Sequence, residues 1–322
     1  MSPIGARRHP AGCSRKGEKE SRMFNSRIAY LCVFLAAACW GSTAAVVKLL
    51  VSDLSALQAL FFMCLFASLS LIVISLLTGQ GRLLVSYSGK DLAAFAVMGF
   101  FGNFLYNLLL YIAIDLLPAQ EAFLINYLWP VMVVIFSIII LREPATARKL
   151  LGILCSFLGV AVVVTGGSIS GLSFSSPAGV ACACLGAVVY GCYSVVGKRY
   201  KYEPFTSVAY FYLFATLYCL VFLLREGVPA LSARQWGGLV FLGTVAGGLG
   251  YAFWFCALRY GDTARMATMI FLTPFLSLVY IRLLIREPIL PSSVIGLILI
   301  TTGIVIQSAR RTGRSPRAAD GV

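Results

Sequence analysis

The chain has 322 residues, of which 60% are hydrophobic and only 12% charged, and its formal net charge is +14. The mean hydropathy of +0.90 excludes an ordinary water-soluble domain, because such domains are about a quarter charged and about half apolar. We expect a polytopic α-helical membrane protein. Its Lys and Arg residues would set orientation and attract anionic lipid, and nucleic acid is not an expected partner.

Ten segments are apolar over the roughly 20 residues that a membrane-spanning helix needs. In chain order they are 28–50, 56–77, 92–114, 119–141, 148–166, 177–197, 207–224, 236–258, 264–285 and 291–309. Short connections between them predict one compact bundle. The polar stretches 1–27 and 310–322 are expected to be disordered cytoplasmic tails.

The Lys and Arg residues are distributed unevenly between the two sides that this topology defines. If the N-terminus is cytoplasmic, 21 of them fall in inner loops and tails and 5 in outer ones, together the 26 of the chain. The positive-inside rule therefore predicts that both termini are cytoplasmic.

Two halves of the sequence match at a fixed offset of 144 residues. The matching pairs are LREP at 141–144 with IREP at 285–288, Pro130 with Pro274, Gly152 with Gly296, and Gly159 with Gly303. Each half holds five spans, an odd number, so the second half enters the membrane from the opposite side. The sequence predicts an inverted repeat of five and five helices, over 28–166 and 177–309, a construction known in secondary transporters.

One segment of the fourth span carries a family resemblance. EAFLINYLWP at 121–130, with the doubled pattern of 143–159, resembles the EamA domain of the drug/metabolite transporter superfamily, and within it the aromatic amino-acid exporters. The resemblance covers all ten spans and implies a ten-helix exporter in a bacterial inner membrane. The second half departs from it, with FLTP at 271–274 in place of YLWP at 127–130.

The fourth span also places polar and aromatic groups deep in the membrane. At 1.5 Å per residue, Pro130 lies about 16 Å along a helix that begins near 119, about half of the hydrocarbon core. Trp129 is then too deep for the aromatic belts at the membrane surface. Pro130 leaves the carbonyl of Asn126 without its helical donor and is expected to kink the helix. The Asn126 amide either bonds another helix or lines the substrate path, and both interpretations remain open.

Further aromatic and amide residues lie at comparable depth, and together they predict a substrate cavity. They are Trp40 and Thr43 in the first span, Asn103, Tyr106 and Asn107 in the third, Tyr127 in the fourth, Tyr190 in the sixth, and Tyr251 and Trp254 in the eighth. Each alone is also a common packing residue. As a set they suit an amphipathic zwitterion, whose ammonium can lie against an aromatic ring.

Three more residues are assigned by position. Glu121 lies near the outer end of the fourth span, where it either meets substrate or pairs with Lys48. Pro130 and Pro274 occupy equivalent depths in the two halves and are expected to be flexing points for gating.

Sequence motifs for enzymes and ATP-driven pumps are absent. There is no GxxxxGK[ST] loop, and the single His is His9 in the polar tail. These patterns favour a secondary exporter of amino acids or similar small metabolites in the lipid bilayer, without cofactor, metal or catalytic residues. A drug-like cation or a nucleotide-sugar-like metabolite is the alternative substrate, and an intramembrane enzyme or scaffold is a distant alternative. A monomer is compatible with the sequence, which does not fix the oligomeric state.

Overall fold

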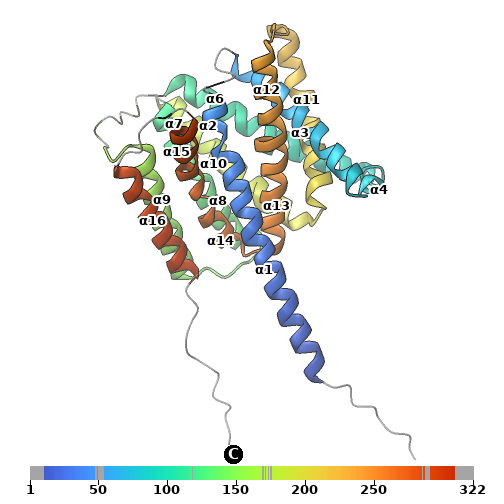
Figure 1. Ribbon diagram of the computed structural model, residues 1–322, viewed down its shortest axis with the longest axis vertical. Helices are drawn as coiled ribbons and strands as arrows, with labels where there is room; N and C mark the ends of the chain where they lie inside the picture. The colour runs from blue at the N-terminus through green and yellow to red at the C-terminus, as the bar shows by residue number, and fades with distance from the viewer. Residues whose placement is uncertain are drawn as a thin grey trace, which may run out of the picture.

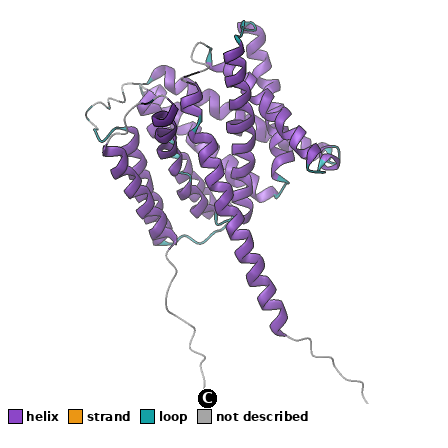
Figure 2. Cartoon of the chain, viewed as in Figure 1, coloured by secondary structure: helices purple, strands orange, loops and turns teal. Residues whose placement is uncertain are grey.

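The computed structural model describes residues 11–47, 49, 54–117, 119–168, 170, 172, 174, 176–284, 286 and 291–308, and every element in them is helical (Figures 1 and 2). The elements of the first half are α1 Ala11–Gly41, α2 Thr43–Val46, α3 Ala56–Leu77, α4 Gly81–Leu84, α5 Gly89–Met98, η2 Gly99–Leu105, α6 Tyr106–Leu116, α7 Ala119–Asn126, α8 Trp129–Ile140 and α9 Ala147–Val164. Those of the second half are α10 Pro177–Tyr200, α11 Pro204–Glu226, α12 Ala233–Phe241, η3 Leu242–Leu249, α13 Gly250–Tyr260, α14 Thr263–Met269, α15 Leu272–Leu284 and α16 Pro291–Ser308.

All ten predicted ranges contain helix. Within the described residues, eight helical stretches are long and apolar enough to cross a membrane. The other two ranges correspond to α1 with α2 and to α16, whose apolar part is the shorter stretch Val294–Gln307. The structure therefore supports a membrane protein made of helices.

The N-terminal stretch differs from the sequence expectation. We expected residues 1–27 to be disordered, but α1 begins at Ala11 and continues into the first predicted span. The sequence there is rich in Lys, Arg and Glu, which favour helix. Once the apolar part of α1 has formed, each further residue adds a hydrogen bond without a new nucleation cost. Residues 1–10 and 309–322 lie outside the described part of the chain.

The third and eighth predicted spans each contain a π-helical stretch in place of a continuous α-helix. These stretches are η2 and η3, which begin at nearly equivalent positions of the two halves. The Trp40 Nε1 donates a hydrogen bond of 3.0 Å to the Ala246 carbonyl of η3. A Cβ on Gly250 would lie 2.7 Å from that Nε1, so a glycine leaves the space for the Trp40 indole.

The fourth and ninth spans are interrupted near their middles. The first break separates α7 from α8, which has Pro130 in its first turn, and the second separates α14 from α15, which has Pro274 in its first turn. The first turn of a helix tolerates proline because its N–H groups have no intrahelical partner there. The kink that the sequence predicts at Pro130 is thus a break in the helix.

Helices α9 and α16 pack closely through the repeated glycines. A Cβ on Gly152 would lie 2.8 Å from the Gly303 carbonyl oxygen, and one on Gly159 would lie 2.5 Å from that of Gly296. Between these contacts, the Ser156 Oγ donates to the Ile300 carbonyl at 3.1 Å. Ser156 and Ile300 are 144 residues apart, so equivalent positions of the two halves meet here.

Other helix pairs also join the two halves. α3 packs along α11, α1 packs along α13, and α10 packs along α6 and α8. In Figure 1 the connection from α6 to α7 lies at the upper end of the bundle. The connection from α13 to α14 lies at the lower end. The core between these ends comes from both halves.

Candidate functional site

A cavity of about 720 Å³ opens between the two halves. Nine of the predicted substrate-binding residues line it: Trp40, Thr43, Tyr106, Asn107, Asn126, Tyr127, Trp129, Tyr190 and Tyr251. Its lining includes α2, α6 and α7, which place the cavity in the upper half of the bundle in Figure 1. Cavities of this size are typical of small-molecule sites.

Four aromatic rings from different helices form one wall of the cavity. The Trp129 ring centroid lies 4.8 Å from that of Tyr190 and 6.0 Å from that of Trp40, both edge to face. The Trp40 ring lies 5.3 Å from the Tyr251 ring. Such edge-to-face pairs stabilise one another beyond the area that they bury. The wall is therefore preformed, and it joins helices of both halves.

Asn126 both bonds another helix and lines the cavity. It is the last residue of α7 and lies beside α6. Its Nδ2 donates to the Tyr106 hydroxyl at 3.2 Å, while its buried Oδ1 has no hydrogen-bond partner. A buried acceptor without a donor costs stability. The amide thus retains unused hydrogen-bonding capacity beside the cavity.

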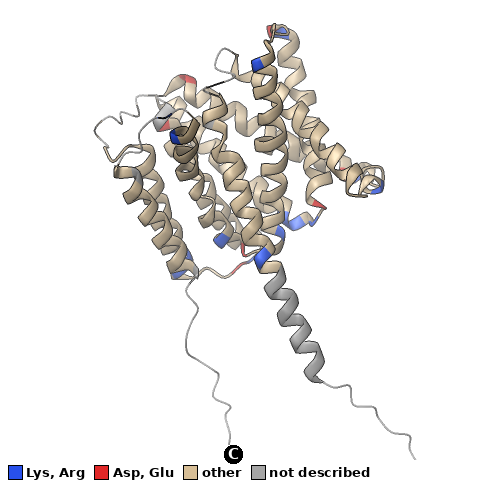
Figure 3. Ribbon diagram, in the orientation of Figure 1, with Lys and Arg blue, Asp and Glu red and all other residues tan. Residues whose placement is uncertain are grey.

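Charge is absent from the described residues that line the cavity. Among them are amides, hydroxyls, rings and aliphatic groups, but no Asp, Glu, Lys or Arg. Figure 3 shows the same pattern for the bundle, because the coloured residues lie toward the helix ends and the middle is tan. An uncharged cavity favours a solute with no net charge, since an isolated ion is costly to bury.

Three predicted residues do not line the cavity. Trp254 lies behind its wall, with the indole N–H donating to the Ser194 hydroxyl at 3.1 Å. Asn103 is fully buried in η2, with no hydrogen-bond partner for either side-chain polar atom. Glu121 is 1% exposed, and its Oε2 accepts the backbone N–H of Phe174 at 3.0 Å.

Glu121 bonds a backbone amide outside the cavity lining. Its carboxylate bonds the connection between α9 and α10 and does not line the cavity. The expected partner Lys48 lies outside the described residues. Pro130 and Pro274 also lie behind the lining, at the two helix breaks.

The structure adds lining residues that the sequence interpretation missed. They are Val47, Met63, Leu110, Phe123, Ala246, Gly247, Thr273 and Ser277. Two of these residues could have been identified from the sequence. The repeat offset maps Trp129 onto Thr273, and Ser277 lies one helical turn further on. The aliphatic lining residues could not be identified in this way, since an aliphatic residue in a membrane helix can face either the lipid or the protein core.

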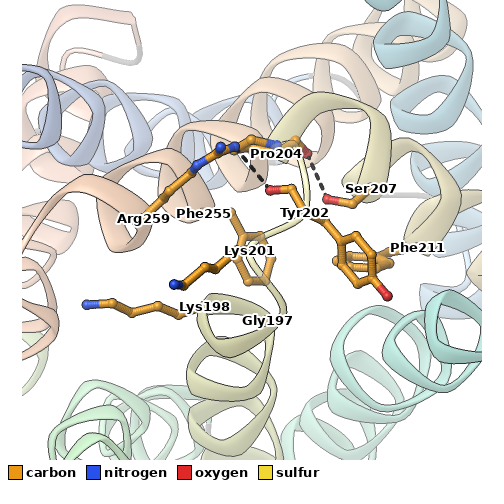
Figure 4. A pocket seen from close by; sticks show the side chains of 9 residues that line it. All are labelled: Gly197, Lys198, Lys201, Tyr202, Pro204, Ser207, Phe211, Phe255 and Arg259. Atoms are coloured by element: carbon orange, nitrogen blue, oxygen red, sulfur yellow. Dashed lines mark hydrogen bonds between the residues drawn. The ribbon is translucent and has the colours of Figure 1, made fainter. Parts of the chain in front are cut away.

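A second, smaller pocket lies at the lower end, where α10 meets α11 (Figure 4). The cations of Lys198, Lys201 and Arg259 border it, and the Arg259 guanidinium donates to the Tyr202 carbonyl at 3.3 Å. Its volume of about 20 Å³ holds roughly one water molecule. This pocket is too small for a transported solute.

Among the described residues, no three His, Cys, Asp or Glu gather into a metal-binding group.

Comparison with known families agrees with a helical membrane protein. The EamA-like transporter family matches residues 27–165 and again residues 177–309. The chain belongs to the EamA-like transporter family. The two matched segments nearly coincide with the halves that the repeat defines, and the resemblance noted from the sequence is confirmed.

Several relatives of this family member are named as transporters. An uncharacterized transporter of Archaeoglobus fulgidus is 29% identical over 226 residues, which are 69% of this chain and 79% of that protein. The aromatic amino acid exporter YddG of Ancylobacter novellus is 30% identical over 184 residues, 56% of this chain and 64% of that protein. YddG of Salmonella typhimurium is 26% identical over 58% of this chain and 66% of its own length.

A solved crystal structure shares the fold. It superimposes with a TM-score of 0.78 over 87% of this chain and 97% of its own, at 21% sequence identity. At that identity the likeness concerns the arrangement of the helices alone.

Proposed function

We propose that this EamA-family transporter is a secondary-active exporter of amino acids, including aromatic or large apolar ones, or of similar small metabolites. The observation that carries the proposal is the cavity of about 720 Å³, whose described lining carries no charged side chain and includes a wall of four aromatic rings. A zwitterion has no net charge, and an apolar side chain can lie against the rings. Relatives named aromatic amino acid exporters support the same substrate class.

The alternative substrate, a drug-like cation, has less support. A cation in a membrane cavity needs a nearby carboxylate, because an unpaired charge in low dielectric is strongly disfavoured. The described lining contains no carboxylate. Glu121 is directed to the Phe174 backbone and not to the cavity.

Transport is proposed to proceed by alternating access between two inverted halves of five spans each. The two family matches, the helix breaks at Pro130 and Pro274, and the glycine contacts of α9 with α16 support this arrangement. In inverted-repeat transporters the halves rock about a central site. The cavity lies toward one end of the bundle, as expected for one of the two access states.

The lower end of Figure 1 is proposed to face the cytoplasm of the inner membrane, with both termini on that side. The excess of Lys and Arg in the predicted inner loops and tails supports this orientation. Reporter fusions should show a cytoplasmic reporter active after residue 147 and an external reporter active after residue 171. The opposite pattern would reject the orientation.

Efflux measured for each of the twenty amino acids from proteoliposomes tests the substrate proposal. We expect Trp129→Ala to lower efflux of aromatic and large apolar amino acids about fivefold, since an aromatic contact is worth about 1 kcal/mol beyond its buried area. Efflux of small amino acids should fall much less. Trp236→Ala is the matched control, because Trp236 is 42% exposed and packs against Phe62 and Phe66, outside the cavity. Efflux of organic cations alone would favour the alternative.

A further inference from the structure

A network of charged and hydroxyl groups lies at the lower end of the bundle. The Glu143 Oε1 accepts from the Lys198 Nζ at 3.2 Å and from the Thr263 hydroxyl at 2.5 Å. Its Oε2 lies 3.5 Å from the Lys149 Nζ, which donates to the Asp262 Oδ2 at 2.8 Å. The Lys198 Nζ also donates to the Thr263 Oγ1 at 2.7 Å. These five residues bond one another in one continuous network.

The network joins three segments that are far apart in the sequence. Glu143 and Lys149 flank the start of α9, Lys198 lies in the last turn of α10, and Asp262 and Thr263 lie where α13 turns into α14. The Thr263–Glu143 bond spans 120 residues. The turn between α13 and α14 is the tip of a helical hairpin. The network therefore ties that tip to α9 and α10.

The tip must move if the cavity is to open downward. Between the cavity and the network lie Trp254 of α13 and Ser194 of α10, which are hydrogen-bonded to each other and fully buried. The backbone also holds the tip, because the Lys198 Nζ donates to the Gly261 carbonyl at 3.0 Å. A downward path between α10 and the hairpin requires these bonds to break.

Burial makes the network stronger than an ordinary surface ion pair. The side chains of Lys149, Glu143 and Lys198 are only 11%, 17% and 19% exposed. Partly buried charges are screened less by water and salt than exposed ones. Removing one partner leaves the others with uncompensated charge. When the whole network separates, however, each group can return to water, so the closure is reversible.

The repeat carries only part of the network to the upper end. Glu143 has the counterpart Glu287, which lies outside the described residues. At the offset of 144 residues, Asp262 and Thr263 correspond to Pro118 and Ala119, and Lys149 corresponds to Ser293. The side chains of Pro and Ala cannot accept a hydrogen bond from lysine. The sequence of the upper tip therefore offers no counterpart of the Asp262 carboxylate or the Thr263 hydroxyl.

We propose that Glu143, Lys149, Lys198, Asp262 and Thr263 form a lock that keeps the lower end closed. We further propose that this lock, whose Asp262 and Thr263 have no counterparts in the other half, makes the upward-open state the resting state. This inference rests on the alternating access proposed above. The lock biases the equilibrium between the two access states, because its bonds exist in only one of them.

Hydrogen–deuterium exchange of the purified full-length protein in lipid nanodiscs tests the lock without any substrate. In Asp262→Asn we expect the exchange rate at residues 261–269 to rise about threefold, which corresponds to the loss of one partly exposed ion pair. The exchange rate at residues 119–126 should fall. The reciprocal change is the signature of rocking, since the upper tip closes as the lower one opens. Asp91→Asn is the control, because Asp91 bonds Ser88 and Tyr202 outside the network.

A double-mutant cycle keeps the result independent of folding defects. Because Lys149 and Asp262 bond each other, Asp262→Asn should add little to exchange in a Lys149→Met background. A rise in exchange at 261–269 without a fall at 119–126 would show that the network only stabilises its own surroundings, and would overturn the lock. Unchanged exchange, or additive effects of the two variants, would overturn it as well. Reciprocal exchange without amino-acid efflux would leave the lock in place and reject the proposed substrate instead.

Discussion

The cavity and the lock handle polar groups in opposite ways. In the cavity, the described lining carries no charge, and the Asn126 Oδ1 has no hydrogen-bond partner. In the lock, the carboxylates and ammonium groups bond one another. A buried polar atom without a partner can gain a bond from a ligand, whereas a satisfied network gains nothing from one. The comparison separates residues that determine substrate specificity from residues that determine which access state is populated.

The largest effect is expected when charge is placed in the cavity. Asn126→Asp keeps the shape of the side chain but adds a carboxylate, and an uncompensated buried charge costs several kcal/mol. Efflux of neutral amino acids should fall more than about tenfold, while that of lysine should gain relative to them. The measurement is proteoliposome efflux of leucine, phenylalanine and lysine. An unchanged ranking would show that Asn126 holds helices together and does not meet the solute.

An intermediate effect is expected at the helix breaks, which belong to neither region. Pro130→Ala and Pro274→Ala restore backbone freedom at the first turns of α8 and α15. Such changes are worth about 1 kcal/mol, or about fivefold in a rate. We expect each variant to slow efflux about that much with little change in substrate affinity, measured by equilibrium binding. Normal rates in both variants would make the prolines packing residues.

The smallest effect is expected when the lock loses its uncharged member. Thr263→Val preserves the shape but removes the hydroxyl that bonds Glu143 and Lys198. A lost hydrogen bond costs about 1 kcal/mol, so Tm should fall by about 2–4 °C. The ranking of the twenty amino acids in efflux should stay the same. A changed ranking would contradict the separation between lock and cavity.

The sequence predicted the helices well because a membrane allows few other structures. Long apolar runs mark helices, since every backbone group must be bonded within the segment. The close approach of a neighbour to α9 could also be predicted, because Gly152 and Gly159 lie seven residues apart on one helix face. That this neighbour is α16 came from the structure. The helix in 11–27 was missed, because polar composition alone does not distinguish a helix from a disordered tail.

The cavity was predicted in part. Deep polar and aromatic residues such as Asn126, Trp129 and Tyr190 stand out against a lipid-like background. Trp254 carries the same signal but packs behind the wall, because periodicity gives the face of a helix and not its neighbours. The lock was not predicted, because Lys149 and Asp262 lie 113 residues apart and each resembles an ordinary loop charge.

The glycine contacts of α9 with α16 also offer a practical advantage. Neither helix contributes a described residue to the cavity, and both turn apolar side chains such as Leu154 and Ile298 outward. A pair held at backbone distance has little room to slide. It therefore supplies a fixed reference frame for spectroscopy. A label on the outer face of α9 and a second on α7 would record the displacement of α7 alone.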